Sequence, residues 1–343
     1  MADTVRLRRS DLSREGIRRR RCGRGFRYLG PGAKAITDPR VLDRIASLVI
    51  PPAWEDVWIC PDPRGHIQAM GTDAAGRRQY RYHDLWRVQR DRQKHDRMLQ
   101  FGQALPHLRS VVRRHLETKG LTRDRVLAAA VRLIDLGFFR PGGEEYAEEN
   151  GTFGLATIRR EHVTLSQGQL VFSYTAKGDK HREQAVAEEQ VCAVVRSLKR
   201  RRSGGDQLLA YRSGPRWHDV TAADINDYLR EATGGEFTAK DFRTWHATVL
   251  AAVGLAVSEP AASGERSSKR AVARVVQEVA DYLGNTPAVA RASYIDPRLV
   301  DLYQCRITIA SALKNLGQDR DFGELATGGY AERAVLKLLA RHG

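Results

Sequence analysis

Cysteine is scarce in this sequence and scattered along it. Cys22, Cys60, Cys192 and Cys305 form no C-x-x-C pair and have no histidine at the spacing of a metal ligand. This argues against a disulfide framework and a structural zinc site, and we expect reduced thiols in a cytoplasmic protein. The sequence also lacks a cluster of acidic residues and histidines of the kind that holds catalytic metals, so we expect no metal cofactor.

Long apolar runs are absent as well. No stretch of about 18 apolar residues occurs, which argues against a membrane-spanning helix. The first residues carry charge without an apolar stretch behind them, so we expect no signal peptide. No internal repeat is visible. These absences favour a protein that works inside the cell and away from the membrane.

Positive charge is what the sequence has in excess. Its 343 residues include 57 Lys and Arg against 41 Asp and Glu, a formal net charge of +16. Residues 1–110 hold 23 basic and 12 acidic residues, so most of the excess lies in the first third. A surface this basic indicates a polyanionic partner, and we expect nucleic acid. The arginines of residues 1–30 are typical of a partly disordered arm or of the rim of a DNA groove.

Turn residues punctuate the next part of the chain. From residue 30 to residue 82, Pro- and Gly-rich turns separate short β-type runs such as 57–60 and 66–70, which predicts a small antiparallel sheet. Residues 77–83 then interleave cationic and aromatic side chains. This mixture suits contact of Arg with phosphates and of Gln and Tyr with bases or sugars. An edge strand with its tyrosines packed inward would give the same pattern.

Helical periodicity dominates the rest. It predicts helices over residues 84–116, 123–136, 191–199, 219–232, 239–257, 298–315 and from 331 to the end. Residues 155–190 instead predict a three-stranded antiparallel unit, with strands at 155–158, 163–165 and 170–175. Turns are expected at 167–168 and 177–180. The Pro-, Gly- and Ser-containing stretch 258–268 predicts a mobile connection.

The stretch 283–297 carries the clearest local signals. An apolar helical pattern ends just before Gly284, where a left-handed cap is expected. Thr286 then offers an N-cap hydroxyl, with Pro287 at the first helical position, so we expect a second, short helix to about residue 295. Asn285 falls in the corner between the two helices, and Tyr294 lies two turns further on. Taken alone, a tyrosine in this place more often simply packs against a core.

Five residues in chain order have a chemical sense for phosphoryl transfer: Arg140, Lys177, Arg243, Asn285 and Tyr294. Two guanidinium forks, Arg140 and Arg243, match the non-bridging oxygens of a phosphodiester under in-line attack. Lys177, at a predicted hairpin tip, can protonate the leaving 5′-hydroxyl, which an arginine cannot. Neighbouring guanidiniums would help to form the attacking phenolate of Tyr294. Singly, a capping arginine or a solvated lysine would look the same.

With their surroundings, these residues make the chain resemble the type IB DNA topoisomerases, in particular the short poxviral and bacterial branch. The likeness runs from about residue 20 to beyond residue 300. The stretches that carry it are Pro-Pro-Ala-Trp at 51–54, Arg-Gln-Tyr-Arg-Tyr-His at 78–83, Phe-Arg-Pro-Gly-Gly at 139–143, Asn-Gly-Thr-Phe-Gly-Leu-Ala-Thr at 150–157, Tyr-Thr-Ala-Lys at 174–177, Thr-Ala-Lys-Asp-Phe-Arg-Thr-Trp at 238–245 and residues 283–294.

The resemblance implies an α+β fold of the tyrosine recombinase and topoisomerase IB type. We expect a small, mainly antiparallel-β DNA-clamp domain, residues 1–95, and a larger, mainly α-helical catalytic domain with a small antiparallel sheet, residues 96–343. The sequence places the boundary between residues 90 and 105. The family further implies a monomer that clamps double-stranded DNA on the nucleoid and has no obligate protein partner.

The resemblance also implies residue roles. Tyr294 is the expected nucleophile of a 3′-phosphotyrosyl intermediate, Arg140 and Arg243 hold the phosphate, and Lys177 is the general acid. One phosphodiester replaces another, so relaxation of supercoils of either sign should need neither ATP nor a metal. The residues expected to contact DNA are Arg78, Gln79, Tyr80, Tyr82 and Lys240.

One position departs from part of the family, because poxviral and nuclear members have histidine where this chain has Asn285. An asparagine amide can donate a hydrogen bond to a phosphate oxygen, but it carries no charge and shuttles no proton. We therefore expect Asn285 to stabilise the phosphate only.

Two other functions compete. Tyrosine site-specific recombinases share the Arg, Lys, Arg and Tyr chemistry, but they usually carry His-x-x-Arg where this chain has Lys240-x-x-Arg243. Their N-terminal domain is a helical bundle, which the β-type region before residue 82 argues against. A noncatalytic DNA-binding protein would explain the charge but would leave the ordered set of five residues unexplained.

Overall fold

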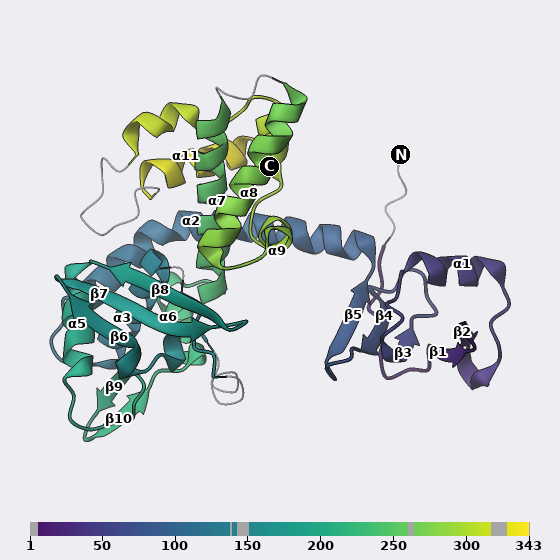
Figure 1. Cartoon of the computed structure of the whole chain (residues 1–343), viewed down its shortest axis with the longest axis horizontal. Helices are drawn as coiled ribbons and strands as arrows, with labels where there is room; N and C mark the ends of the chain where they lie inside the picture. Colours follow the sequence, from purple (N-terminus) through teal and green to yellow (C-terminus); the bar gives the residue numbers. More distant parts are fainter. Residues whose placement is uncertain (1–5, 138, 143–150, 260–263, 317–327, 343) are drawn as a thin grey trace. The chain divides into compact units, whose positions relative to one another are not determined.

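The fold is known from a computed structural model, which describes residues 6–137, 139–142, 151–259, 264–316 and 328–342. The chain divides into two compact units, Met1–His95 and Asp96–Gly343 (Figure 1). The first unit is built on an antiparallel sheet, and the second is mainly helical with small sheets. This confirms the predicted α+β fold class.

The first unit is built on a five-stranded sheet with the order β2-β1-β3-β4-β5, in which every pair is antiparallel. Its strands are β1 (Ile17–Cys22), β2 (Gly25–Leu29), β3 (Glu55–Ile59), β4 (Ile67–Thr72) and β5 (Arg78–Tyr82). Helix α1 (Pro39–Ser47) lies between β2 and β3 in the chain. Its Ile45 packs with Ile17 and Ile59 in a small core. The inward side chains of the strands thus meet one apolar helix face.

Of the two alternatives predicted for residues 1–30, the partly disordered arm is wrong for β1 and β2, whereas the rim of a DNA groove stays a prediction. Ile17 buries its side chain against the core, and the arginines after it lie in a paired strand. Arg19 is held in place, because its guanidinium carbon lies 4.2 Å from the centre of the Phe26 ring and its nitrogens donate to backbone carbonyls between residues 50 and 54. Long arginine stems can line a strand while their charged heads stay in water.

Helix α2 (Asp84–Leu116) confirms the predicted helix and continues through Pro106. The second unit adds α3 (Arg123–Gly137), α5 (Glu189–Lys199), α6 (Ala222–Thr233), α7 (Ala239–Ser258), α8 (Glu265–Leu283), α9 (Pro287–Ser293), α10 (Arg298–Gln304) and α11 (Tyr330–Arg341). A single large apolar core runs through these helices. Trp245 of α7 is fully buried in it and reaches α2 at Gly102, where an added Cβ would lie 2.7 Å from the indole.

The small sheet differs from the prediction. It has the order β6-β7-β8, from β6 (Val163–Ser166), β7 (Gln169–Ala176) and β8 (Lys180–Val186). Residues 155–158, expected as a strand, instead begin a 3-10 turn, Leu155–Thr157, because the N–H groups of Leu155 and Ala156 donate to the carbonyls of Arg140 and Pro141. The third strand of the sheet is β8, which the sequence did not predict because this segment is polar and has few apolar residues.

Other boundaries shift too. The helix expected from residue 219 begins at Ala222, because a hairpin of β9 (Ala210–Ser213) and β10 (Arg216–Asp219) precedes it. The helix expected over 298–315 divides into α10 and a 3-10 helix, Ala310–Asn315, with Arg306 at a positive φ of 61° between them. Of the expected connection 258–268, residues 260–263 lie outside the described chain. No helix in the described ranges is both long and apolar enough to span a bilayer.

Candidate active site

Local signals place Tyr294 as predicted. Gly284 ends α8 in the left-handed conformation, with φ 64°, and Thr286 and Pro287 begin α9. Tyr294 is the C-cap of α9, and its N–H donates to the carbonyl of Ala290 at 3.0 Å. The hydroxyl of Thr248 on α7 donates to the carbonyl of Tyr294 at 3.2 Å. The tyrosine backbone is therefore held against α7.

Arg243 lies on the same helix, α7, and is 2% exposed. Its guanidinium carbon is 5.6 Å from the centre of the Tyr294 ring, and its Nη2 donates to the carbonyl of Leu283 at 2.8 Å. Burial, and after it the charge of Arg140, lower the pKa of Arg243 to about 10, although the phenol of Tyr294 acts in the opposite direction. At neutral pH the side chain therefore remains a cation next to the tyrosine.

Arg140 reaches the same place from the segment after α3. Its Nη2 donates to Oδ1 of Asn285 at 2.7 Å and approaches the carbonyl of Gly284 at 3.4 Å. Burial lowers the pKa of this guanidinium too. Two glycines hold the segment: an added Cβ on Gly154 would lie 2.3 Å from Cα of Gly142, which itself has φ 85°. Close backbone packing therefore positions Arg140.

Asn285 occupies the corner between α8 and α9. Its Oδ1 accepts from Arg140, whereas its Nδ2 is buried and has no hydrogen-bond partner among the residues that the structure describes. A buried amide donor left without a partner costs about 1–3 kcal/mol. An anionic oxygen in the site would satisfy it.

Lys177 stands at the tip of the β7–β8 hairpin, as predicted, and is exposed. Gly178 and Asp179 follow it with positive φ angles of 81° and 55°, which the tight turn requires. Lys177 lines a pocket of about 400 Å³ with Arg140 and Asn285. Three of the five predicted residues therefore share one pocket, while Arg243 and Tyr294 contact each other directly beside it.

A residue that the sequence did not single out joins this group. Arg182 on β8 donates to the carbonyl of Tyr282 at 3.0 Å and approaches that of Leu283 at 3.5 Å. Together with Arg140 and Arg243 it surrounds the last carbonyls of α8, which carry the negative end of the helix dipole. Arg182 follows Lys177 by five residues, in the second strand of the hairpin. This spacing could have pointed to the site only if the hairpin register had been known.

Of the five residues predicted to contact DNA, four are exposed and Gln79 is half-buried. Arg78, Tyr80 and Tyr82 point outward from β5, an edge strand, and the two tyrosines are 39% and 37% exposed. The alternative in which they pack inward is therefore wrong. Gln79 on the other face donates to Asp73 at 2.9 Å. Lys240 is exposed in the first turn of α7.

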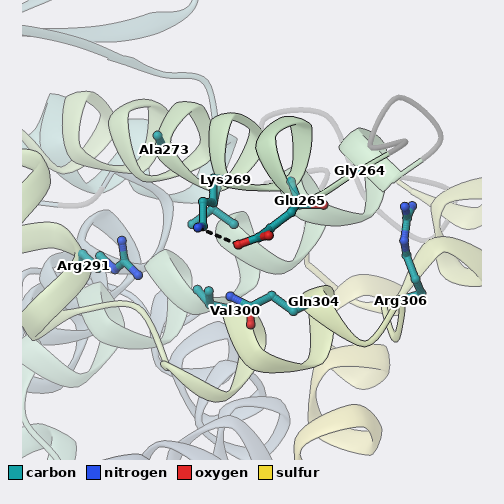
Figure 2. Close-up of a pocket in the computed structure, with 10 residues that line it drawn as sticks. Gly264, Glu265, Lys269, Ala273, Arg291, Val300, Gln304 and Arg306 are labelled. Atoms are coloured by element: carbon teal, nitrogen blue, oxygen red, sulfur yellow. Dashed lines mark ion pairs between the residues drawn. The ribbon is translucent and has the colours of Figure 1, made fainter.

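A second, larger pocket of about 710 Å³ lies between α8, α9 and α10. Figure 2 shows Lys269 and Glu265 paired on α8, 2.7 Å apart, with Arg291 and Gln304 across from them. None of the five predicted residues lines it. Within the described ranges, no group of three or more His, Cys, Asp or Glu residues could hold a metal ion.

Two models of known protein families match this chain. Residues 83–315 match the catalytic core of eukaryotic DNA topoisomerase I, and residues 25–73 match the N-terminal domain of bacterial DNA topoisomerase IB. The chain belongs to the type IB DNA topoisomerases. It is therefore an isomerase whose substrate is DNA. The catalytic-core match spans all five predicted residues, although Gly143 and Asn150 of the resembling stretches lie outside the described residues.

Individual relatives support the same family. The DNA topoisomerase 1B of Acanthamoeba polyphaga mimivirus is 29% identical over 297 residues, which cover 84% of this chain and 88% of that protein. The DNA topoisomerase 1B of vaccinia virus strain Copenhagen is 20% identical over 234 residues, 68% of this chain and 71% of the viral one. The DNA topoisomerase 1 of Candidozyma auris is 31% identical over 129 residues, 37% of this type IB topoisomerase and 16% of the yeast protein.

Proposed function

We propose that this type IB topoisomerase relaxes positive and negative supercoils by cleaving one strand of duplex DNA through a covalent bond to Tyr294. The observation that supports this most is the gathering of Arg140, Arg243 and Asn285 around the end of α8, beside the Tyr294 ring. The arrangement offers two guanidiniums and a buried amide donor to one phosphate.

In the proposed step, Tyr294 loses its phenolic proton to water, and the resulting phenolate oxygen attacks the phosphorus in line. A phosphorus–oxygen bond to tyrosine forms as the bond to the 5′-oxygen breaks, and Lys177 gives that oxygen its proton. Arg140 and Arg243 stabilise the charge on the non-bridging oxygens. Each guanidinium has five N–H donors, so each can hold the backbone of α8 and a phosphate oxygen at once.

The product is a 3′-phosphotyrosyl enzyme and a free 5′-hydroxyl. While the strand is open, the duplex can rotate and lose supercoils of either sign. Attack of the 5′-hydroxyl on the phosphotyrosine then restores the DNA and the tyrosine. Because one phosphodiester replaces another, the cycle requires neither ATP nor a metal ion, and Asn285 contributes a neutral hydrogen bond only.

The remaining residues are assigned to binding. We propose that residues 1–95 form a DNA-clamp domain, in which Arg78, Gln79, Tyr80 and Tyr82 of β5 contact the duplex. Residues 96–343 form the catalytic domain, and Lys240 contacts DNA from the start of α7. The exposed ring faces and guanidinium of β5 match the sugar, base and phosphate chemistry of such a surface. The enzyme then acts as a monomer on the nucleoid in the cytoplasm.

Plasmid relaxation tests this proposal. Negatively and positively supercoiled plasmids are incubated in EDTA without ATP, with the wild type, Tyr294→Phe and, as a matched loss of a hydroxyl, Tyr330→Phe on the exposed start of α11. We expect the wild type and Tyr330→Phe to relax both substrates and Tyr294→Phe to relax neither. Relaxation by Tyr294→Phe would mean that another residue is the nucleophile. No relaxation by the wild type would contradict the proposed activity.

A further inference from the structure

Arg182 holds the hairpin of Lys177 to the end of α8. From β8, its Nη2 donates to the carbonyl of Tyr282 at 3.0 Å and its Nη1 lies 3.5 Å from that of Leu283. A Cβ added to Gly284 would lie 3.3 Å from the same Nη1, so the guanidinium rests directly on the corner before Asn285.

The strand register places this contact close to the hairpin tip. Arg182 pairs with Tyr174 across the β7–β8 ladder, and three residues beyond Tyr174 the chain reaches Lys177. Tyr174 is buried and stacks on Phe139, the neighbour of Arg140, with ring centres 6.3 Å apart. Directly paired residues lie on the same face of a sheet. Tyr174 thus anchors β7 to the Arg140 segment, and Arg182 anchors β8 to the corner of Asn285.

We propose that Arg182 is a positioning residue, which sets the distance between the general acid Lys177 and the phosphate site at the α8–α9 corner. This inference rests on the proposed function. A proton donor on an exposed tip needs such an anchor, because a displacement of about 1 Å can slow catalysis about 100-fold. The planar guanidinium can bridge two neighbouring carbonyls, whereas the ammonium of a lysine would bond only one of them well.

The leaving group offers a test that depends on Lys177. A duplex in which sulfur replaces the bridging 5′-oxygen releases a thiolate, which leaves without protonation. Single-turnover formation of the covalent adduct is measured on the 5′-oxygen and 5′-sulfur duplexes for the wild type, Lys177→Ala, Arg182→Ala and Arg182→Lys. Arg196→Ala on α5 removes one exposed arginine elsewhere and is the matched control.

On the 5′-oxygen duplex we expect Arg182→Ala to cleave about 10- to 100-fold more slowly, Arg182→Lys to lose less, and Arg196→Ala to match the wild type. On the 5′-sulfur duplex both Lys177→Ala and Arg182→Ala should return to nearly the wild-type rate. The double variant Lys177→Ala with Arg182→Ala should be no slower on the oxygen duplex than Lys177→Ala, because the two changes affect one proton transfer.

Three results would overturn the inference: wild-type rates for Arg182→Ala on both duplexes, an unrescued loss on the sulfur duplex, or additive losses in the double variant. A folding defect in Arg182→Ala would show as a lower midpoint of thermal unfolding. In that case the cleavage rates of Arg182→Lys on the two duplexes are compared with those of the wild type instead. Failure of the proposed function looks different. It would appear as no adduct with the wild type, or as a Lys177→Ala defect that sulfur does not rescue.

Discussion

At the scale of single residues, the site is a set of donors directed at one small region. Arg140 and Arg243 are buried deeply enough for their pKa values to be lowered, yet both bond backbone carbonyls rather than carboxylates. Asn285 adds a buried N–H donor without adding charge.

The amide of Asn285 leads to the residue-scale prediction. Asn285→Ala should slow adduct formation about 100-fold or more, the usual effect of removing one donor from a developing oxyanion. Asn285→Asp should lose more, because it places a negative charge next to the phosphate. Rates are measured in single turnovers, with Gln304→Ala, an exposed amide on α10, as the control. A faster Asn285→Asp than Asn285→Ala would contradict the proposed donor role.

At the scale of elements, a buried polar network joins four helices. Arg109 of α2 makes paired hydrogen bonds to Asp135 of α3 and to Glu332 of α11, with distances from 2.6 to 2.9 Å. His246 of α7 lies 3.1 Å from Asp135, and the indole of Trp245 donates to Glu332. Helix α3 leads into Arg140 and α7 carries Arg243, so this network sets the frame for both arginines.

The network should make stability depend on pH. Burial raises the pKa of Asp135 and Glu332, but the charge and hydrogen bonds of Arg109, together with His246, outweigh it and hold both pKa values below their ordinary values. A lowered pKa in the folded state stabilises the fold above the unfolded pKa of about 4, and this stabilisation is lost as pH falls through the folded value.

Glu332→Gln tests the network. At pH 7 it should reduce the free energy of unfolding by about 3 kcal/mol, because it leaves Arg109 poorly compensated. The difference from the wild type should shrink as the pH falls below about 4. Urea unfolding followed by circular dichroism measures both effects. Glu278→Gln breaks an exposed pair with Arg274 and should cost no more than about 1 kcal/mol. Equal losses for the two variants would contradict the role of burial.

At the scale of the whole molecule, charge is the main feature. Most of the net charge of +16 lies in the first third of the chain, which includes the antiparallel sheet of the first unit. Such a surface releases counterions when it binds a duplex, so affinity should fall steeply with salt. We expect this binding to be independent of sequence and separable from the chemistry proposed for Tyr294.

Two neighbouring substitutions on β5 separate charge from stacking. Arg78→Ala should weaken duplex binding and reduce the slope of log affinity against log salt by about 0.9. Tyr80→Ala should weaken binding with an unchanged slope, because it removes no charge. Fluorescence anisotropy at several salt concentrations measures both, with Tyr294→Phe expected to match the wild type. Unchanged affinity in both variants would exclude β5 from the DNA surface.

Local signals were sufficient where one or two residues control the backbone. Gly284, Thr286 and Pro287 predicted the end of α8 and the start of α9, and the structure confirms both. Polar strands could not be predicted in the same way. The arginines of β1 and the polar residues of β8 show no clear apolar alternation, so the sequence did not mark them as strands. Contacts with distant parts of the chain stabilise these strands instead, such as those of Arg19 with Ile50 and of Arg182 with Tyr282.

The sequence by itself determined the class of chemistry, the helical framework and the corner that presents Asn285 and Tyr294, because side-chain type, helical period and cap residues are local properties. Only the tertiary structure decided that Arg140, Arg182 and Arg243 converge on the same helix end, and that β8 completes the sheet of Lys177. These contacts join residues up to 144 positions apart. They depend on how helices and strands pack, which no local pattern encodes.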